Sequence, residues 1–329
     1  MSSKVYFYIK DLKINFKSFE GEKTVLNIDE IRIDRGKSYG IIGESGTGKT
    51  VLALSILKLL QMPPGRVVRG EISLEGENLL NMSQKRMQSE IRGKKISMIF
   101  QDPMSTLNPV FNIGDQIIKV IMENQNLNKR DAYSKAVEMI NTVKLPDAEN
   151  IMKKYPHELS GGQRQRVIIA LALSCGAQFI IADEPTRNLD VTIQAGILKL
   201  IRELQKNLKV TVLFIANNPG LVSATCDDTA ILYRGEIVER GKTREVLKNA
   251  KHPYTQMLLN AVPKNRKNEI DLNKLVFTEG NAGDDRKGCL YYDRCLKRQD
   301  KCRKKQELLQ LGENHFVKCC LYKGDNDDE

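Results

Sequence analysis

Apolar and polar positions alternate in the first part of the chain, as they do in strands that expose one face. The alternation runs through residues 5–16 and 25–33, and a further short segment lies at 70–74. A period of two places every second side chain on the same face of a sheet. These segments therefore predict a half-exposed antiparallel sheet.

Short, continuous apolar runs predict a second set of strands that is more deeply buried. These runs are residues 38–42, 179–182 and 210–215. An apolar periodic segment, 51–60, follows the first run, and an amphipathic helix over 192–208 separates the other two. A strand, a helix and a second strand in succession favour a right-handed parallel crossover. The fold class predicted here is therefore α/β.

The pattern of apolar and polar residues in the remaining segments indicates how the chain is divided into domains. Helix formers without strand signals fill residues 112–156, which indicates a helical subdomain of about 102–166. The periodic pattern fades over 253–263, and a basic, polar tail that contains cysteines follows. We place the boundary near residue 265, between a main domain of 1–264 and a C-terminal extension of 265–329.

Composition favours a cytoplasmic protein without a membrane span. The 329 residues contain no apolar stretch close to the roughly 20 residues that cross a bilayer. The first ten residues lack the apolar core of a signal peptide. The formal charge of +11 is scattered among acidic residues, which favours a solvated surface over a nucleic-acid partner or an anionic membrane.

A glycine-rich loop follows the apolar run at 38–42 and precedes the helix predicted from residue 51. The loop fits the phosphate-binding P-loop pattern, and a strand before it and a helix after it are the setting that this pattern needs. Its N–H groups and the helix dipole would bind phosphates, Lys49 would reach the β- and γ-phosphates, and Thr50 would hold Mg²⁺. The loop residues are Gly43, Glu44, Ser45, Gly46, Thr47, Gly48, Lys49 and Thr50.

Two acids end the apolar run at 179–182. Asp183 would hold the metal ion through water, and Glu184 would orient and polarise the attacking water as a general base. An acidic turn after a strand is common, so this assignment depends on the P-loop. Together the two motifs predict a nucleotide-hydrolysing site.

Residues 159–166 read Leu-Ser-Gly-Gly-Gln-Arg-Gln-Arg and resemble the signature motif of the ATPases of ABC transporters. Gln101 is at the position of that family's Q-loop glutamine, and residues 187–190 are at its D-loop, which ends in Asp190. The resemblance implies an ATP-binding P-loop NTPase fold with an antiparallel β subdomain and an inserted helical subdomain. It also implies that Gln101 joins Glu184 in catalysis and Thr50 and Asp183 in holding Mg²⁺.

In this family the signature of one subunit contacts ATP that is held by the opposite subunit. The residues that would do so here are Ser160, Gly161, Gly162 and Gln163. Small residues and a serine at a helix start present N–H groups and a hydroxyl to phosphate. Phe16 is where the family stacks an aromatic ring on adenine, although a strand residue that packs inward is the alternative.

Residues 101–109, 155–159 and 252–255 resemble the oligopeptide, dipeptide and nickel importer branch, and within it the first of two ATPase subunits. This implies a second ATPase subunit, two transmembrane permease subunits and an extracytoplasmic solute-binding protein as partners, with the chain at the cytoplasmic face of the membrane. The cargo, peptides or nickel and other metal chelates, stays open. ABC ATPases that act on nucleic acid carry two cassettes or a long coiled-coil insertion, so we predict no nucleic-acid partner.

Four tail cysteines, Cys289, Cys295, Cys302 and Cys319, are separated by five, six and sixteen residues, which is unlike a zinc site. The resemblance extends through this tail and implies a [4Fe–4S] cluster on these four thiolates. Plain reduced cysteines are the main alternative, and Cys320 is a possible substitute for Cys319.

After the apolar run at 210–215 the family has a switch histidine, where this sequence has Asn217. Asparagine donates a hydrogen bond but is shorter and does not titrate near neutral pH. Loss of one positioned donor slows other enzymes by about 10²–10³-fold. Arg187 and Asn188 also replace the small residues usual in the D-loop. We therefore predict an asymmetric heterodimer in which this chain's own site hydrolyses ATP slowly. There are two alternatives: asparagine is a tolerated replacement for the histidine, or the chain is a mainly regulatory subunit.

Overall fold

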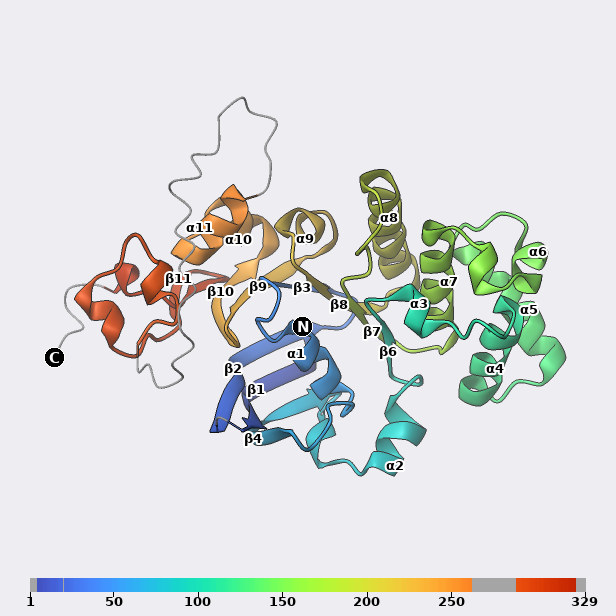
Figure 1. Cartoon of the computed structure of the whole chain (residues 1–329), viewed down its shortest axis with the longest axis horizontal. Helices are drawn as coiled ribbons and strands as arrows, with labels where there is room; N and C mark the ends of the chain where they lie inside the picture. Colours follow the sequence, from blue (N-terminus) through green and yellow to red (C-terminus); the bar gives the residue numbers. More distant parts are fainter. Residues whose placement is uncertain (1–4, 20, 262–287, 324–329) are drawn as a thin grey trace.

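The computed structural model describes residues 5–19, 21–261 and 288–323. Figure 1 shows an antiparallel sheet, a larger sheet beside it, a group of helices at one end and the tail at the other. Within the described ranges, no helix is both long enough and apolar enough to cross a membrane.

The antiparallel sheet forms where the alternating pattern predicts it. Its strand order is β2-β1-β4-β5, and each neighbouring pair is antiparallel. Along β1 the buried positions include Phe7, Ile9, Leu12 and Ile14, which all point into the core. The strands are β1 Val5–Ser18, β2 Gly21–Asp34, β4 Gly65–Leu74 and β5 Glu77–Asn78.

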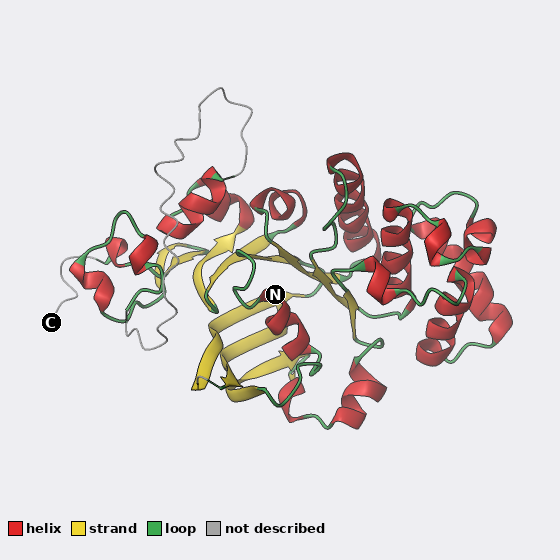
Figure 2. Cartoon of the chain, in the orientation of Figure 1, coloured by secondary structure: helices red, strands yellow, loops and turns green. Residues whose placement is uncertain are grey.

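The larger sheet contains the buried parallel strands, which extend to its edge at β6. Its order is β11-β12-β10-β9-β3-β8-β7-β6, in which β9, β3, β8, β7 and β6 run parallel and the other neighbouring pairs are antiparallel. Figure 2 shows helices along this sheet. The strands are β3 Ser38–Ile42, β6 Ile96–Ile99, β7 Phe179–Asp183, β8 Thr211–Ala216, β9 Asp228–Tyr233, β10 Glu236–Lys242, β11 Leu309–Gly312 and β12 His315–Val317.

The predicted crossover is present, since α8 connects the neighbouring parallel strands β7 and β8. Helix α1 packs between the two sheets, in contact with β2 and β7. The helices outside the helical subdomain are α1 Lys49–Ile56, α2 Gln84–Arg86, α8 Val191–Leu208, α9 Pro219–Thr225, α10 Thr243–Lys248 and α11 Pro253–Asn260.

The helical subdomain appears as predicted. Its helices pack on one another, with α4 against α5, α6 and α7. Asparagine or aspartate caps the N-termini of α3, α4, α5 and α6 by accepting a backbone N–H. The helices are α3 Pro103–Thr106, α4 Ile113–Gln125, α5 Lys129–Thr142, α6 Ala148–Lys153 and α7 Gly161–Ser174.

The described tail is continuous with the larger sheet. Strand β12 pairs antiparallel with β10, and β11 pairs with β12 as the outermost strand. The predicted boundary near residue 265 lies outside the described residues, so it stays a prediction.

Candidate functional site

The P-loop connects β3 to α1, beside the ends of the central parallel strands. Gly48 has a φ of 102°, which side-chain-bearing residues rarely adopt, and leads directly into α1 at Lys49. A Cβ on Gly43 would lie 2.4 Å from the carbonyl oxygen of Leu232, so only glycine fits there. The backbone path thus requires these two glycines of the predicted motif.

Lys49 is almost fully buried within the loop. Its Nζ donates to the carbonyl oxygens of Gly43 at 2.9 Å and Glu44 at 2.8 Å. Burial lowers the pKa of Lys49, while the nearby carboxylates of Glu184 and Asp183 oppose that shift. The ammonium group is therefore placed where a phosphate oxygen would replace its carbonyl partners.

Asp183 ends β7, with only 1% of its surface exposed. Its Oδ1 has no hydrogen-bond partner among the described residues. Burial raises the pKa of this carboxyl group, and a hydrogen bond with Thr50 opposes the rise. A buried carboxylate oxygen without a partner is unfavourable, and a hard cation is a partner that suits it.

These residues fit Mg²⁺. Asp183 offers the unpaired carboxylate oxygen, and Thr50 lies beside it with a hydroxyl. Gln101 donates from Nε2 to Glu184, which leaves its amide oxygen for a metal ion. When bound, the ion would neutralise charge on the β- and γ-phosphates.

Glu184 follows Asp183 directly and has a φ of 45°, an uncommon value outside glycine. Its Oε2 accepts a hydrogen bond from Gln101 Nε2 at 2.8 Å and faces Arg187 Nη1 at 3.4 Å. Both donors bind the same oxygen, so Oε1 is the oxygen left to orient a water molecule. The structure therefore brings Lys49, Asp183, Glu184 and Gln101 together, while their catalytic roles stay predictions.

Asn217 immediately follows β8, the neighbour of β7 in the sheet. Its side-chain oxygen is buried and has no partner among the described residues. Asn218, next along the chain, instead caps α9 by accepting from the N–H of Gly220 at 2.8 Å. Asn217 therefore does not share the capping role of its neighbour, and its role as the switch residue stays a prediction.

The signature forms the N-terminus of α7. Ser160 Oγ accepts from the N–H of Gln163 at 3.3 Å, and Gln163 Oε1 accepts from the N–H of Ser160 at 3.0 Å. Ser160 is exposed, and Figure 1 shows α7 in the helical group, well apart from α1. The structure therefore does not bring the signature to the chain's own P-loop.

The D-loop lies next to the signature. Asp190 caps α8 by accepting from the N–H of Ile193 at 2.9 Å. A Cβ on Gly162 would lie 2.8 Å from Ile193 Cγ2, so glycine lets the start of α7 pack against the start of α8.

Phe16 lies near the end of β1, between Lys23 of β2 and Gly65 of β4. It is half-buried and packs against the core of the antiparallel sheet. Part of its ring stays accessible, so the adenine contact stays a prediction. Phe19, at the tip beyond β1, is fully exposed.

Comparison with known proteins places this site in a family. The pattern described as "ABC transporter" matches residues 26–187, and that described as "Oligopeptide/dipeptide transporter, C-terminal region" matches residues 238–302. The chain is 40% identical over 314 residues to the "Probable D,D-dipeptide transport ATP-binding protein DdpD" of Escherichia coli (strain K12), which covers 95% of each protein. The chain belongs to the ATP-binding proteins of ABC transporters.

Other similarities agree. The chain is 45% identical over 255 residues to the "Oligopeptide transport ATP-binding protein OppD" of Bacillus subtilis (strain 168), covering 78% of this chain and 71% of that protein. Among solved structures, cbiO1 from Clostridium perfringens matches with a TM-score of 0.64 and 25% identity, over 74% of this chain and 91% of that one. The ATP-binding cassette MJ0796, at 24% identity and a TM-score of 0.63 over 72% of this chain and 99% of that one, shows the same fold.

Membership of the family fixes the activity. The chain is an ABC ATPase whose hydrolysis of ATP is coupled to transport across a membrane, where it works as a peripheral subunit. The family's activity uses ATP, with Mg²⁺ as cofactor, and both Lys49 and Glu184 lie within the matched residues 26–187. The individual roles of these residues stay predictions.

The iron–sulfur prediction for this ABC subunit is wrong. Its four residues, together with Cys320, do line one cavity, but its volume is only about 10 Å³. No group of three or more His, Cys, Asp or Glu side chains within the described ranges is arranged to hold a metal ion. Burial raises the pKa of Cys289 to about 12 and of Cys319 to about 11, so burial favours the neutral thiol form of these two side chains. The spacing of the cysteines along the chain does not predict that they are buried. In the structure they pack as small apolar side chains.

Two side chains that contact the P-loop of this ABC subunit were not predicted from the sequence. Tyr254, on α11, accepts a hydrogen bond from the N–H of Glu44 at 3.0 Å, and Arg294, in the tail, forms an ion pair with the Glu44 carboxylate. Arg294 is 250 positions away from Glu44 along the chain, and a local sequence pattern does not predict a contact between residues so far apart.

Proposed function

We propose that this chain is one of two different ATPase subunits that together power a peptide importer. The observation that carries the proposal is that Lys49, Glu184 and Gln101 lie together in a chain whose signature points elsewhere. ATP would then be bound between the P-loop of one subunit and the signature of the other. The main domain, 1–264, would perform this chemistry, with 265–329 as an appended extension.

Hydrolysis in this chain's own site would depend on Glu184. Its carboxylate, held by Gln101, would take a proton from water as the water attacks the γ-phosphate. Lys49 would stay with the β- and γ-phosphates, where its charge offsets the charge that develops in the transition state.

Two features support a weak site on this chain and a stronger one formed with its partner. The switch position carries Asn217, which is shorter than histidine. Arg187, at the D-loop, faces the same Glu184 oxygen that Gln101 binds. This guanidinium would compete for the carboxylate on which the attacking water depends. The intact capping box of Ser160 and Gln163 leaves the signature available to the partner's ATP.

Peptides are the cargo that the comparisons favour. OppD of Bacillus subtilis and DdpD of Escherichia coli are named for oligopeptide and dipeptide transport, and the matched C-terminal pattern carries a similar description. Nickel or a metal chelate is the alternative, and uptake by the assembled system would separate the two. Two permease subunits and an extracytoplasmic solute-binding protein would complete that system.

A surface suited to the permease lies after the Q-loop glutamine. Met104, Val110 and Phe111 are 57%, 71% and 52% exposed, although large apolar side chains are usually buried. These three residues follow Gln101 in the chain, and Gln101 contacts Glu184. A movement at the ATP site would therefore be transmitted to this surface.

The first test is ATP turnover by the reconstituted transporter. Lys49→Ala in this chain is compared with the matching lysine change in the partner ATPase. The proposal expects the partner's change to abolish turnover and Lys49→Ala to slow it only modestly. Equal loss from both would contradict the asymmetry.

Asn217→His provides the reciprocal change. It should raise turnover by this chain's site about tenfold or more, because a positioned donor is restored. In a Glu184→Gln background, Asn217→His should leave turnover unchanged, because this chain's site is then inactive. This comparison shows whether Asn217→His acts anywhere outside this site. Unchanged turnover by Asn217→His in an otherwise wild-type chain would mean that asparagine is a tolerated replacement.

A further inference from the structure

The tail of this ABC subunit reaches the phosphate-binding loop through one ion pair. Arg294 ends a short 3₁₀ turn, Tyr292–Arg294. Its Nη1 lies 2.9 Å from Glu44 Oε2, and its Nη2 lies 3.1 Å from Glu44 Oε1. The contact is therefore bidentate, the geometry in which a guanidinium fixes the orientation of a carboxylate most firmly. Glu44 is the second residue of the P-loop.

Glu44 is held at its backbone as well. Its N–H donates to Tyr254 Oη at 3.0 Å, and its carbonyl accepts from Lys49 Nζ at 2.8 Å and Thr47 Oγ1 at 2.9 Å. The amide, the carbonyl and the carboxylate of one residue are thus all engaged. Among the residues that the structure describes, the tail contacts the carboxylate of Glu44, through Arg294.

Aromatic rings surround this contact. The ring centres of Tyr233 and Tyr254 are 4.5 Å apart, and that of Tyr291 lies 5.3 and 5.5 Å from them. The Arg294 guanidinium carbon is 5.7 Å from the Tyr291 ring centre and 6.0 Å from that of Tyr233. Such contacts favour a cation at this place and restrict its side-chain rotamers.

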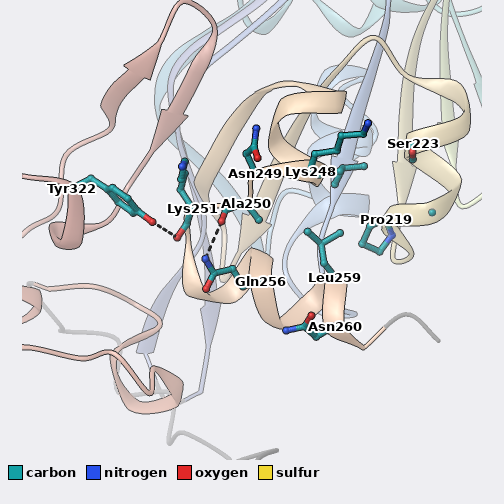
Figure 3. Close-up of a pocket in the computed structure, with 12 residues that line it drawn as sticks. Pro219, Ser223, Lys248, Asn249, Ala250, Lys251, Gln256, Leu259, Asn260 and Tyr322 are labelled. Carbon is teal, nitrogen blue, oxygen red and sulfur yellow. Dashed lines mark hydrogen bonds between the residues drawn. The ribbon is translucent and has the colours of Figure 1, made fainter. Parts of the chain in front are cut away.

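The tail itself is fixed to the main domain at other points. Strand β12 pairs with β10, and Tyr322 Oη donates to the carbonyl of Lys251 at 3.2 Å, just before α11. Figure 3 shows this contact at the edge of a cavity of about 570 Å³ between α9, α10, α11 and the end of the tail. None of the predicted site residues lines that cavity. These anchors fix the segment that follows Arg294 to β10 and to the start of α11.

We propose that Arg294 is a positioning residue for nucleotide binding, which acts through Glu44 on the P-loop. Its guanidinium neutralises a carboxylate in the loop that must receive a triphosphate, and it fixes the loop conformation before ATP arrives. Both effects favour ATP binding, because repulsion is reduced and less freedom is lost on binding. Neither effect acts selectively on the transition state, so ATP affinity is affected and the hydrolysis step is not.

The test is a double-mutant cycle on the full-length chain, read by fluorescence titration with an N-methylanthraniloyl derivative of ATP in the presence of Mg²⁺. Arg294→Gln should raise Kd about two- to fivefold, the scale of a well-formed but partly exposed ion pair. In a Glu44→Gln background the same change should alter Kd less than about 1.5-fold, because the carboxylate on which it acts is gone.

Arg298→Gln is the matched control. Arg298 lies in the same tail, with its guanidinium carbon 5.9 Å from the Tyr292 ring centre and Nη1 donating to the carbonyl of Asp293. It should leave Kd unchanged. Turnover of the assembled transporter adds a second measurement, in which Arg294→Gln raises KM for ATP at constant kcat.

Two results would overturn the proposal. One is an unchanged Kd in a folded Arg294→Gln chain, with folding judged by circular dichroism. The other is an equal increase in Kd with and without the Glu44 carboxylate, which would show that Arg294 acts through the tail fold. If Arg294→Gln does not fold, Arg294→Lys takes its place in the same cycle, because it keeps the charge and loses the bidentate contact. The proposal for Arg294 rests on the ATP site and does not depend on the proposed cargo or on the proposed pairing of subunits. A negative result for Arg294 would therefore leave the proposed function standing, and a negative result for the proposed function would leave the role of Arg294 standing.

Discussion

Asp183 and Glu184 are adjacent, yet their surroundings give them different properties. Asp183 is buried with an unpaired oxygen, whereas the Glu184 carboxylate is held by an amide and a guanidinium. Burial raises the pKa of Asp183, so this residue is unfavourably placed until a cation binds. One site thus contains a carboxylate suited to metal and a carboxylate suited to water.

His252 makes the stability of the chain sensitive to pH. It is buried, its Nδ1 accepts from the N–H of Tyr254 at 3.1 Å, and burial lowers its pKa to about 3. The unfolded chain takes up this proton near pH ~6.5, so stability is complete above that pH and declines as the pH falls towards 3. Between pH 7 and 5 we expect a loss of about 2 kcal/mol from this residue.

Thermal melting of the full-length chain at several pH values tests this expectation. His252→Asn keeps a capping side chain and removes the titrating ring, so its melting temperature should fall less over the same range. His157→Asn is the control, because His157 is exposed. An equally steep fall in His252→Asn and wild type would show that another group carries the pH dependence.

At this scale local motifs indicated which residues would lie close together, while their roles stay predictions. Lys49 starts α1, just before the predicted helix, and Asp183 and Glu184 follow the apolar run that forms β7. The cysteine prediction failed because ligation depends on how thiols point and whether they ionise, which spacing does not report. Arg294 was missed because its partner is distant along the chain.

At the scale of elements, Glu239 joins three parts of the structure. It lies on β10 with 0% exposure, where its Oε1 accepts from the N–H of Lys251 at 2.8 Å and pairs with His315 Nε2 at 2.7 Å. Its Oε2 accepts from the N–H of His252 at 2.9 Å. One carboxylate thus holds β10, the segment before α11 and β12 together.

Removal of this carboxylate should destabilise the chain strongly. Glu239→Ala leaves two backbone N–H groups without their partner, and we expect a loss of about 3–5 kcal/mol in the free energy of unfolding. Glu245→Ala, at an exposed position on α10, should change it by less than about 0.5 kcal/mol. Urea denaturation compares the two, and a loss of under about 1 kcal/mol for Glu239→Ala would contradict the role of this residue.

Glu239 also shows why strand β10 was not predicted from the sequence. Strands with continuous apolar or alternating patterns, such as β3 and β7, were predicted almost to the residue. Strand β10 reads Glu-Ile-Val-Glu-Arg-Gly-Lys and was not predicted, because a polar residue inside it is buried against distant partners. Helix α1 ends at Ile56, before the predicted residue 60, because Lys58 turns the backbone to a φ of 50°.

At the scale of the whole molecule, two hydrophobic clusters meet around the larger sheet. One includes the helical subdomain, and the other fills the space under the antiparallel sheet. Phe7 of β1 stacks on Phe179 of β7 with ring centres 4.7 Å apart, and both are 0% exposed. This pair connects the two sheets.

Phe7→Ala should lower the free energy of unfolding by about 3–5 kcal/mol, because a large ring is lost from a closed core. Phe19→Ala removes the same ring from a fully exposed position and should change it by less than about 0.5 kcal/mol. Chemical denaturation at neutral pH measures both. Similar values for the two would mean that the contact between the sheets contributes little.

The pairing of β12 with β10 also determines how the chain behaves when it is shortened. Hairpin β11–β12 covers the side of β10 that would otherwise present unpaired N–H and C=O groups. A strand left open in this way can recruit the strands of other molecules. Chains truncated before residue 309 should therefore self-associate at micromolar concentration, and proteolytic removal of the hairpin should make a monodisperse protein aggregate.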